Sequence, residues 1–245
     1  MAGRRAYVIG DIHGRLDLLD ALLEKIHTEL EHRPARKTLL VFVGDLIDRG
    51  PSSAQVIERL RTYRRHGVRP VFILGNHEEV LLRILGGDAD LIIKWRWFGG
   101  TQCLESYGVD VEQLAVLNPD AQLAMVRGAI PRSHVEFLES FVDTCRFGDY
   151  LFVHAGIRPG IAVEEQLQSD LRWIREPFLL DDVDHGFVVV HGHTISDQVE
   201  ERPNRIGIDT GAYRSGVLTA LAIEDGGRWY VDTREMADAD PAPTD

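Results

Sequence analysis

The sequence predicts an α/β fold, arranged as one mixed β-sheet or as two sheets packed together. Residues 1–85 alternate short apolar runs with stretches of helical periodicity, which is typical of parallel strands joined by helical crossovers. The last third instead contains short strands separated by turns, which favours hairpins. Each predicted strand of the first half ends in glycine followed by polar residues, so we expect a functional site at that edge of the sheet.

Three predicted strands and three predicted helices alternate in the first half. Apolar residues fill each strand, whereas leucine, isoleucine and valine recur at helical spacing in the segments between them. In chain order, the strands cover residues 6–9, 39–43 and 71–74, and the helices lie around residues 16–30, 56–60 and 78–85. This β-α-β-α-β-α order predicts a largely parallel sheet.

The rest of the chain changes character twice. Residues 88–141 show short helical patterns broken by glycine and proline, and the final third holds further strands. We expect these strands at residues 145–147, 150–153, 187–190, 205–208, 217–223 and 229–231, with the first two forming a hairpin. Because no linker or repeat divides the chain, we expect one domain over residues 1–235 and a disordered polar tail at residues 236–245.

Composition excludes several classes of protein. The chain has 245 residues with 27 Lys+Arg and 39 Asp+Glu, which gives a formal net charge of −12. Such an acidic chain is a poor general binder of nucleic acid, although a local basic pocket is compatible with it. No apolar run reaches the ~18 residues of a membrane helix, and the N-terminus lacks a signal-peptide pattern. Since only Cys103 and Cys145 are present, we expect a cytoplasmic protein. From the acidic charge and the lack of a long apolar run, we expect no nucleic-acid or membrane partner.

Five apolar runs end in residue types that bind metals. The motifs are GDIHG at residues 10–14, GDLIDRGP at 44–51, GNHE at 75–78, HAG at 154–156 and HGHT at 191–194. Taken singly, a Gly-Asp pair is usually a turn or helix cap, and a buried histidine is usually a hydrogen-bonded core residue. Five such strand ends together favour a shared site, and their carboxylate, amide and imidazole groups suit Mn, Fe or Zn.

In this order and spacing, the five motifs resemble those of the calcineurin-like metallophosphoesterases. The forms DRG at residues 48–50 and NHE at 76–78 are those of the phosphoprotein phosphatase branch, in particular of bacterial and phage serine/threonine phosphatases related to symmetrical dinucleoside tetraphosphatases. Shorter similarities are WIRE at 173–176 and IDTGA at 208–212, so the resemblance covers about residues 6–232. It implies a sandwich of two mixed sheets flanked by helices, with a βαβαβ core and a dinuclear metal site at the strand ends.

The resemblance also implies the metal ligands. It assigns Asp11 and His13 to one ion, makes Asp45 the bridge, and assigns the other ion to Asn76, His154 and His193. His191 is expected beside these ligands without binding an ion itself. The expected cofactor is two divalent ions, with Mn as the first choice and Fe, Zn or Ni as alternatives.

The same resemblance makes His77 the general acid that protonates the leaving oxygen. Asp48 is expected to orient the His77 imidazole, because a carboxylate partner raises the pKa of a histidine. Arg49 and Arg175 are expected to bind phosphate oxygens through their planar guanidinium groups. For Arg175 the alternative is a surface ion pair with a nearby glutamate.

Two tryptophans in the middle segment allow two interpretations. Trp95 and Trp97 have a spacing that would let both line a substrate groove. Packing in the core is the interpretation we favour for them, since an aromatic pair at such spacing more often serves stability than binding.

The function predicted from these residues is metal-dependent hydrolysis of phosphomonoesters by direct attack of a hydroxide that bridges the two ions. The expected substrate is a phosphoprotein, with serine/threonine preferred and tyrosine as an alternative. The second hypothesis is a symmetrical bis(5'-nucleosyl)-tetraphosphatase or related nucleotide phosphohydrolase; Asp48 argues against it, because that branch tends to carry a non-acidic residue there. Hydrolysis of cyclic nucleotides is a third option. An inactive binding module is disfavoured because no expected ligand or acid is missing, and the oligomeric state stays open.

Overall fold

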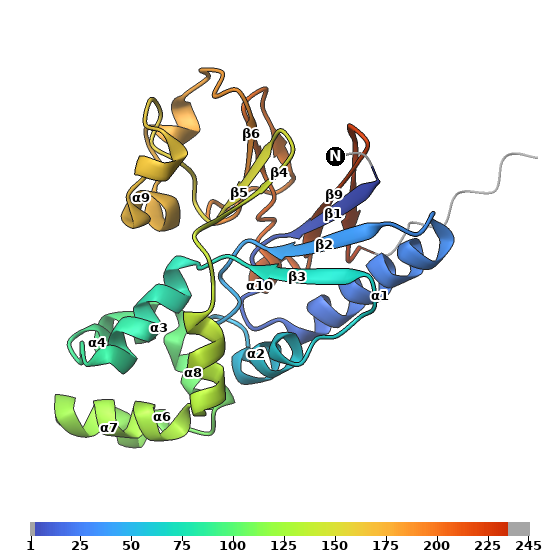
Figure 1. Ribbon diagram of the computed structural model, residues 1–245. Helices are drawn as coiled ribbons and strands as arrows, with labels where there is room; N and C mark the ends of the chain where they lie inside the picture. Colours follow the sequence, from blue (N-terminus) through green and yellow to red (C-terminus); the bar gives the residue numbers. More distant parts are fainter. Residues whose placement is uncertain (1–2, 235–245) are drawn as a thin grey trace, which may run out of the picture.

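Two five-stranded sheets form the centre of the protein in the computed structural model, which describes residues 3–234 (Figure 1). The first sheet has the strand order β10-β9-β1-β2-β3, and the second has the order β4-β5-β6-β8-β7. Both sheets mix parallel and antiparallel pairs, which confirms the expected two-sheet α/β sandwich. The tail predicted for residues 236–245 lies outside the described part of the chain.

The first sheet has a parallel centre. Strand β1 pairs in parallel with β2, and β2 pairs in parallel with β3, so all three end at the same edge. Strands β9 and β10 extend the other side of β1 in antiparallel fashion. The strands are β1 Arg4–Ile9, β2 Lys37–Phe42, β3 Val68–Phe72, β9 Thr219–Glu224 and β10 Gly227–Asp232.

The second sheet contains the predicted hairpin of β4 and β5. Strand β6 runs parallel to both β5 and β8, and β7 closes the sheet by pairing antiparallel to β8. The strands are β4 Thr144–Phe147, β5 Tyr150–Val153, β6 Val188–His191, β7 Glu200–Glu201 and β8 Arg205–Gly207. Strands β5 and β6 therefore also have parallel carboxyl ends from which polar residues can reach a common site.

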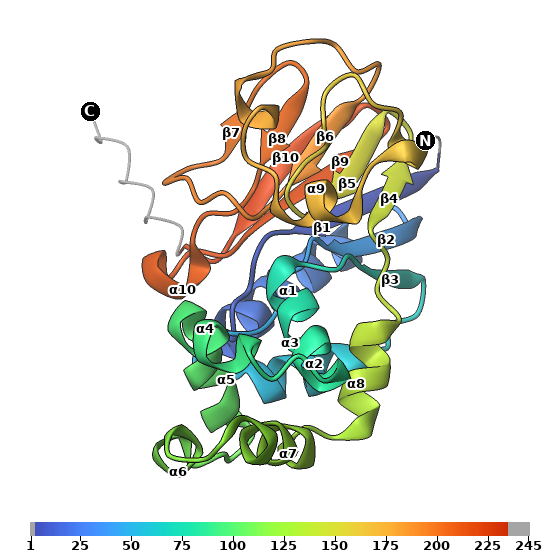
Figure 2. The ribbon, with the colours of Figure 1, turned by 90° about the vertical axis from the view of Figure 1, so that its left-hand side faces the viewer.

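Helices α1 and α2 cover the face of the first sheet that is turned away from the second sheet (Figure 1). The larger helices are α1 Leu16–His32, α2 Ser53–Arg61, α3 Asn76–Gly86, α7 Pro119–Ala129 and α8 Arg132–Glu139. Shorter helices are α4 Leu91–Trp95, α5 Thr101–Ser106, α6 Val111–Ala115, α9 Gln168–Trp173 and α10 Ala212–Ser215. A π-helical turn covers Arg96–Gly100, and 3₁₀ turns cover Val163–Glu165 and Phe178–Leu180. Figure 2 shows α4 to α7 gathered on one side of the sheets.

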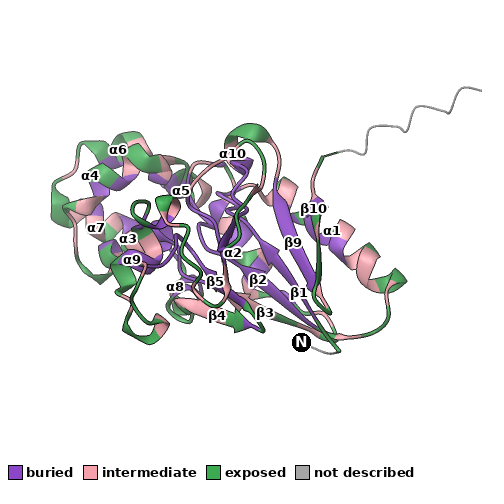
Figure 3. Cartoon of the chain, turned by 90° about the horizontal axis from the view of Figure 1, so that it is seen from above, coloured by how far each residue is buried: buried purple, intermediate pink, exposed green. Residues whose placement is uncertain are grey.

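Alternating side chains of β1 serve two different cores. Tyr7 and Ile9 pack with the helices, whereas Ala6 and Val8 pack between the two sheets, as the pleat of a strand requires. All four are fully buried, and the central strands lie in the buried interior in Figure 3. A third cluster lies under α9 and includes Phe178.

Most predicted elements are present with shifted ends. The third strand ends two residues earlier than predicted, at Phe72, and the following helix begins two residues earlier, at Asn76. The Glu78 carboxylate accepts a hydrogen bond from the Gly75 amide at 3.1 Å, so the helix starts directly after this glycine. Asn76 and His77 consequently lie in the first turn of α3. No helix within residues 3–234 is long and apolar enough to cross a lipid bilayer.

Candidate metal and phosphate site

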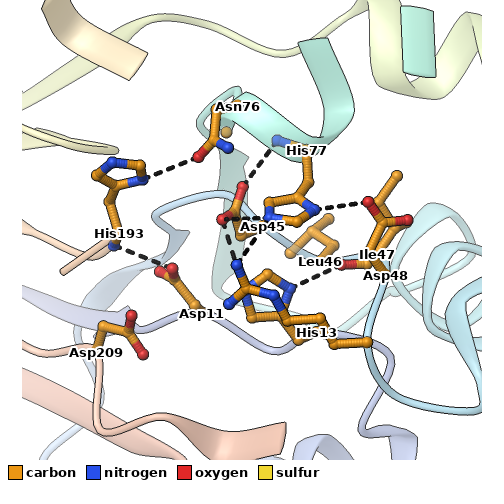
Figure 4. A network of polar contacts seen from close by, with 12 residues as sticks. Asp11, His13, Asp45, Leu46, Ile47, Asp48, Asn76, His77, His193 and Asp209 are labelled. Carbon is orange, nitrogen blue, oxygen red and sulfur yellow. Dashed lines mark hydrogen bonds and ion pairs between the residues drawn. The ribbon is translucent and has the colours of Figure 1, made fainter. Parts of the chain in front are cut away.

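The predicted site residues gather where the strands of both sheets end (Figure 4). Asp11 and His13 follow β1, Asp45 follows β2, and Asn76 begins α3 after β3. From the second sheet, His154 follows β5 and His193 follows β6. These six side chains are buried, with exposed fractions between 0% and 9%. The structure thus brings together every residue expected to bind metal.

The turns that carry these residues have an unusual backbone. His13, Asp45, Asp48, Arg49 and His193 all have positive φ angles, between 47° and 73°. Within residues 3–234, the other non-glycine residue with positive φ is Asp225. Left-handed backbone is unfavourable for L-residues and concentrates at functional sites, where the surrounding structure holds it in place. The local strain therefore marks the same residues that the motifs indicate.

Asp45 lies at the centre of two possible metal-binding groups. One group contains His13, Asp45 and His77, and the other contains Asp45, His154 and His193, with ligand atoms within 4.8 Å of one another in each. The two oxygens of Asp45 face different groups: Oδ2 lies 3.6 Å from Nε2 of His13, and Oδ1 lies 3.4 Å from Nε2 of His154. This geometry suits a carboxylate shared by two ions.

Two histidines are held in one ring orientation by backbone carbonyl groups. Nδ1 of His13 donates to the carbonyl oxygen of Ile47 at 2.8 Å, and Nδ1 of His154 donates to that of Val43 at 2.8 Å. Nε2 of each ring then presents its lone pair to the site, as is usual for metal-bound histidine. Burial lowers the pKa of both His13 and His154, which favours the neutral form that a metal requires.

Asn76 connects the residues of the second group. Its Oδ1 lies 2.9 Å from Nε2 of His154 and 2.9 Å from Nδ1 of His193. Nε2 of His193 is buried and has no hydrogen-bond partner. Burial lowers the pKa of His193 to about 3, so this ring is neutral at physiological pH.

Asp11 gives a direct test of whether the residues fit a cation. Its Oδ2 accepts a hydrogen bond from the amide of His193 at 3.0 Å, but its buried Oδ1 has no partner. Burial, together with the nearby Asp209 and Asp45, raises the pKa of Asp11 well above its usual value. Unpaired buried carboxylate oxygens beside neutral imidazoles are stabilised by bound cations. The donor set therefore fits divalent metal ions.

His77 and Asp48 form a short contact beside the first group. Nδ1 of His77 lies 2.6 Å from Oδ2 of Asp48, and Trp95 donates its indole N–H to the same oxygen at 2.7 Å. Burial opposes protonation of His77, but Asp45 and Asp48 outweigh it and raise its pKa to about 9. Arg49 lies beside this pair, with Nη2 3.1 Å from Nε2 of His77.

Glu78 is a buried residue that we did not predict as part of the site. Its carboxylate accepts backbone N–H groups from Gly75, Asp45, Leu46 and Ile47, at 2.8 to 3.3 Å. It thus ties the start of α3 to the turn that carries Asp45. The only signal in the sequence was a glutamate three residues after the capping position Gly75, which is typical of a helix start.

Asp209 is a second buried carboxylate that motif analysis left without a role. It follows β8 in the sequence IDTGA and lies beside Asp11 (Figure 4). The Gly211 amide donates to its Oδ1 at 2.9 Å, whereas its Oδ2 is buried without a partner. It could have been found as a sixth strand end carrying an aspartate.

A cavity of about 260 Å³ opens beside these groups. Arg175 lines this cavity together with His77 and His193. Arg175 forms no ion pair with any of the described residues, so the surface ion pair considered for Arg175 is absent. The cavity as a whole is lined by Arg49, Asn76, His77, Val80, Trp95, Phe98, Trp173, Arg175 and His193.

The two tryptophans of the middle segment differ. Trp95 packs in the core, as expected, and also lines the cavity, whereas Trp97 is 86% exposed, so core packing was the wrong prediction for it. The π-helical turn that begins after Trp95 rotates Trp97 outward, which its spacing in the sequence did not indicate. His191 lies outside both metal-binding groups, and its Nδ1 lies 3.0 Å from the carbonyl oxygen of Gly192.

Comparison with known proteins identifies the class. Residues 4–219 match the calcineurin-like phosphoesterase family, so the chain belongs to this family of dinuclear metal-dependent phosphoester hydrolases.

Relatives within the family act on different phosphate compounds. The chain is 28% identical to serine/threonine-protein phosphatase 2 of Escherichia coli, with 90% of this chain and 94% of the relative covered. It is 37% identical to a symmetrical bis(5'-nucleosyl)-tetraphosphatase of Cronobacter sakazakii, with 96% of both covered. An asymmetrical bis(5'-nucleosyl)-tetraphosphatase of Bacillus velezensis is 26% identical, with 89% of this chain and 88% of the relative covered.

Solved structures agree with the fold. A putative diadenosine tetraphosphatase superposes with a TM-score of 0.65 at 22% identity, covering 94% of both chains. A cold-active protein-tyrosine phosphatase of a psychrophilic Shewanella superposes with a TM-score of 0.56 at 16% identity, covering 94% of this chain and 82% of that one.

Proposed function

We propose that this enzyme is a phosphatase for phosphomonoesters on proteins, with serine/threonine side chains as the expected substrates. The observation that carries the proposal is the 2.6 Å contact between His77 and Asp48 at the edge of the cavity. A monoester releases an alkoxide, which needs a proton from a well-oriented acid. An anhydride such as a dinucleoside tetraphosphate releases a nucleotide that needs such an acid less.

In this proposal, Asp11, His13 and Asp45 hold one ion, and Asp45, Asn76, His154 and His193 hold the other, with Mn as the expected metal. Two bound divalent ions would ionise a water molecule and neutralise charge on the phosphoryl oxygens. Asp45 is central because its two oxygens face the two groups separately. Glu78 keeps Asp45 in place by accepting the backbone N–H groups of that turn.

The remaining residues bind the phosphoryl group and move the proton. Nε2 of a protonated His77 donates its proton to the leaving oxygen, while Asp48 accepts from Nδ1 and fixes the ring. The raised pKa of His77 supports this assignment, because the ring carries the proton at neutral pH. Arg49 and Arg175 both line the cavity and bind phosphoryl oxygens with their guanidinium groups.

Hydrolysis of dinucleoside tetraphosphates is the second candidate. The coverage of a symmetrical tetraphosphatase relative over 96% of both chains supports it. Asp48 argues against it, since its position beside His77 serves a leaving group that needs protonation.

The test is a parallel assay of metal-depleted protein reloaded with Mn. Phosphoserine and phosphothreonine peptides, diadenosine tetraphosphate and p-nitrophenyl phosphate are compared by kcat/KM, with the metal content counted in the same samples. We expect metal-dependent hydrolysis with the phosphopeptides preferred over diadenosine tetraphosphate. Preference for the dinucleotide would select the second candidate, and full activity of the metal-depleted protein would contradict both.

A further inference from the structure

The wall of the cavity around His77 is largely apolar. Val80 of α3, Phe98 of the π-helical turn and Trp173 of α9 line the same cavity as His77. If His77 is the acid of the proposed function, the group that leaves the phosphorus lies on the His77 side and therefore against these side chains. These side chains are therefore positioned to contact the leaving group.

Phe98 is held at a fixed place relative to Arg49. The Arg49 amide donates to the carbonyl oxygen of Gly99, the next residue after Phe98, at 3.0 Å. A Cβ at Gly99 would lie 2.6 Å from the Arg49 nitrogen, and a Cβ at Gly100 would lie 2.4 Å from the Trp95 ring. Neither glycine can gain a side chain without moving its neighbour, so the turn is packed directly against Arg49.

Trp173, at the end of α9, is held in place by a hydrogen bond to α3. Its indole N–H donates to the Glu79 carboxylate at 2.9 Å, and that carboxylate also lies 3.6 Å from Arg172. Trp173 is 43% exposed and Phe98 is 54% exposed, although both are large aromatic residues. Two aromatic rings anchored beside a phosphate site, yet left partly uncovered, offer contact area to a substrate.

The charges of this wall do not suit a polyphosphate leaving group. Among the described residues that line the cavity, Arg49 and Arg175 carry the permanent positive charges, and the proposed function uses both on the transferred phosphoryl group. Lys94 lies over the Phe98 ring, 5.9 Å from its centre. A departing nucleoside polyphosphate would bring several negative charges against the apolar side chains of Val80, Phe98 and Trp173, and Lys94 over the Phe98 ring is not among the residues that line the cavity.

The cavity has room for a phosphoryl group with one attached ring, at a volume of about 260 Å³. A serine side chain would leave the aromatic wall uncovered, whereas a tyrosine ring would cover it.

We propose that Phe98 and Trp173 form a subsite for an aromatic leaving group, so that phosphotyrosine is bound in preference to phosphoserine and to dinucleoside polyphosphates. This inference rests on the proposed phosphatase function, and it replaces the serine/threonine preference stated there with a preference for phosphotyrosine. It assigns Phe98 a role in specificity, through direct contact with the ring of the substrate.

The experiment compares two peptides of identical sequence that carry either phosphotyrosine or phosphoserine. KM and kcat are measured on the Mn-loaded enzyme for the unsubstituted chain and for Phe98→Ala, Phe98→Tyr and Trp97→Ala. Trp97→Ala is the matched control, because Trp97 is a neighbouring exposed aromatic residue that does not line this cavity. Diadenosine tetraphosphate is assayed alongside.

We expect Phe98→Ala to raise KM for the phosphotyrosine peptide about tenfold, with a change of less than about twofold for phosphoserine. Phe98→Tyr should restore the low KM, and Trp97→Ala should leave both values unchanged. Equal changes for the two peptides, or no change, would overturn the subsite while leaving the phosphatase function intact. A larger effect on diadenosine tetraphosphate would assign the wall to a nucleobase instead, and absence of metal-dependent hydrolysis of all three substrates would refute the proposed function itself.

Discussion

The turns at the strand ends and the short helices of residues 88–106 both border the candidate site, but they are built differently (Figure 2). The turns are buried, carry positive φ angles and hold the charged and imidazole groups. The helices carry aromatic side chains, of which Trp97 and Phe98 are exposed. This difference fits two separate roles, in which the buried turns position the charged groups and the exposed aromatic side chains are free to contact a substrate.

Glycines illustrate how closely the turns are packed. A Cβ at Gly75 would lie 2.3 Å from Oδ1 of Asp45 and 2.4 Å from the Asp45 amide nitrogen. In α3, by contrast, a Cβ at Gly86 would have no atom within 4 Å. An added methyl group at Gly75 must therefore displace a site residue, whereas Gly86 at the end of α3 has room for one. Four predictions test this contrast.

The largest effect is expected for Asp45→Asn. The substitution removes the negative charge that faces both groups of possible ligands, so binding of both ions should weaken together. We expect hydrolysis of every substrate to fall more than about 10³-fold, because an electrostatic group and the metals are lost at once. Metal content is measured by mass spectrometry, with Asp20→Asn on the exposed face of α1 as the control. Two ions per chain and near-normal turnover in Asp45→Asn would place the bridge elsewhere.

His77→Asn should separate proton transfer from metal binding. A general acid contributes typically 10²–10⁴-fold, so turnover of phosphoserine should fall within that range. With p-nitrophenyl phosphate the loss should be clearly smaller, since p-nitrophenolate departs without a proton. Metal content should stay close to that of the unsubstituted protein, because Asn76 is the expected ligand.

Asp48→Asn is the matched partner variant, and it should show a milder form of the same pattern because it removes the carboxylate that orients the ring. The measurement is turnover against a series of aryl and alkyl phosphates with metal counted in parallel. Equal losses across the series, or loss of metal in His77→Asn, would show that His77 is a metal ligand or a structural residue instead of the acid. His77 does lie in one of the two possible metal-binding groups, so this outcome is informative.

The sequence predicted the turns at the strand ends better than the helical segment of residues 88–106. The strand ends were predictable because parallel strands place their carboxyl ends together, so motifs far apart in the chain identify one site. Asp209 and Glu78 were missed because their roles depend on burial and on backbone N–H groups that become neighbours only in the folded chain. Trp97 was assigned to the core because helical periodicity does not reveal the π-helical turn, where Gly99 has φ 109°.

Gly75→Ala and Gly86→Ala compare the turns with the helices directly. The added methyl group at Gly75 must displace Asp45 or Glu78, so we expect the free energy of unfolding to fall by about 1–3 kcal/mol, the usual cost of overpacking. Activity should fall as well, roughly tenfold or more, because a shift of Asp45 disturbs the metal groups. Gly86→Ala should change stability by less than about 1 kcal/mol, in the stabilising direction. Urea unfolding and turnover of p-nitrophenyl phosphate provide the readouts; equal tolerance at the two positions would contradict the proposed rigidity of the turns.

The smallest effect is expected where the two regions meet, at Trp95. Its indole N–H donates to Oδ2 of Asp48, the oxygen that also contacts His77, so a residue of the helical segment helps to hold the proposed orienting carboxylate. Trp95→Phe keeps an aromatic ring against Gly100 but removes this donor, and a lost hydrogen bond of this kind costs about 0.5–1.5 kcal/mol. We expect a loss of only a few fold in turnover, larger for phosphoserine than for p-nitrophenyl phosphate, with the metal content unchanged. If turnover of the two substrates falls equally, Trp95 acts only through packing. The helical segment then has no influence on proton transfer by His77 and Asp48.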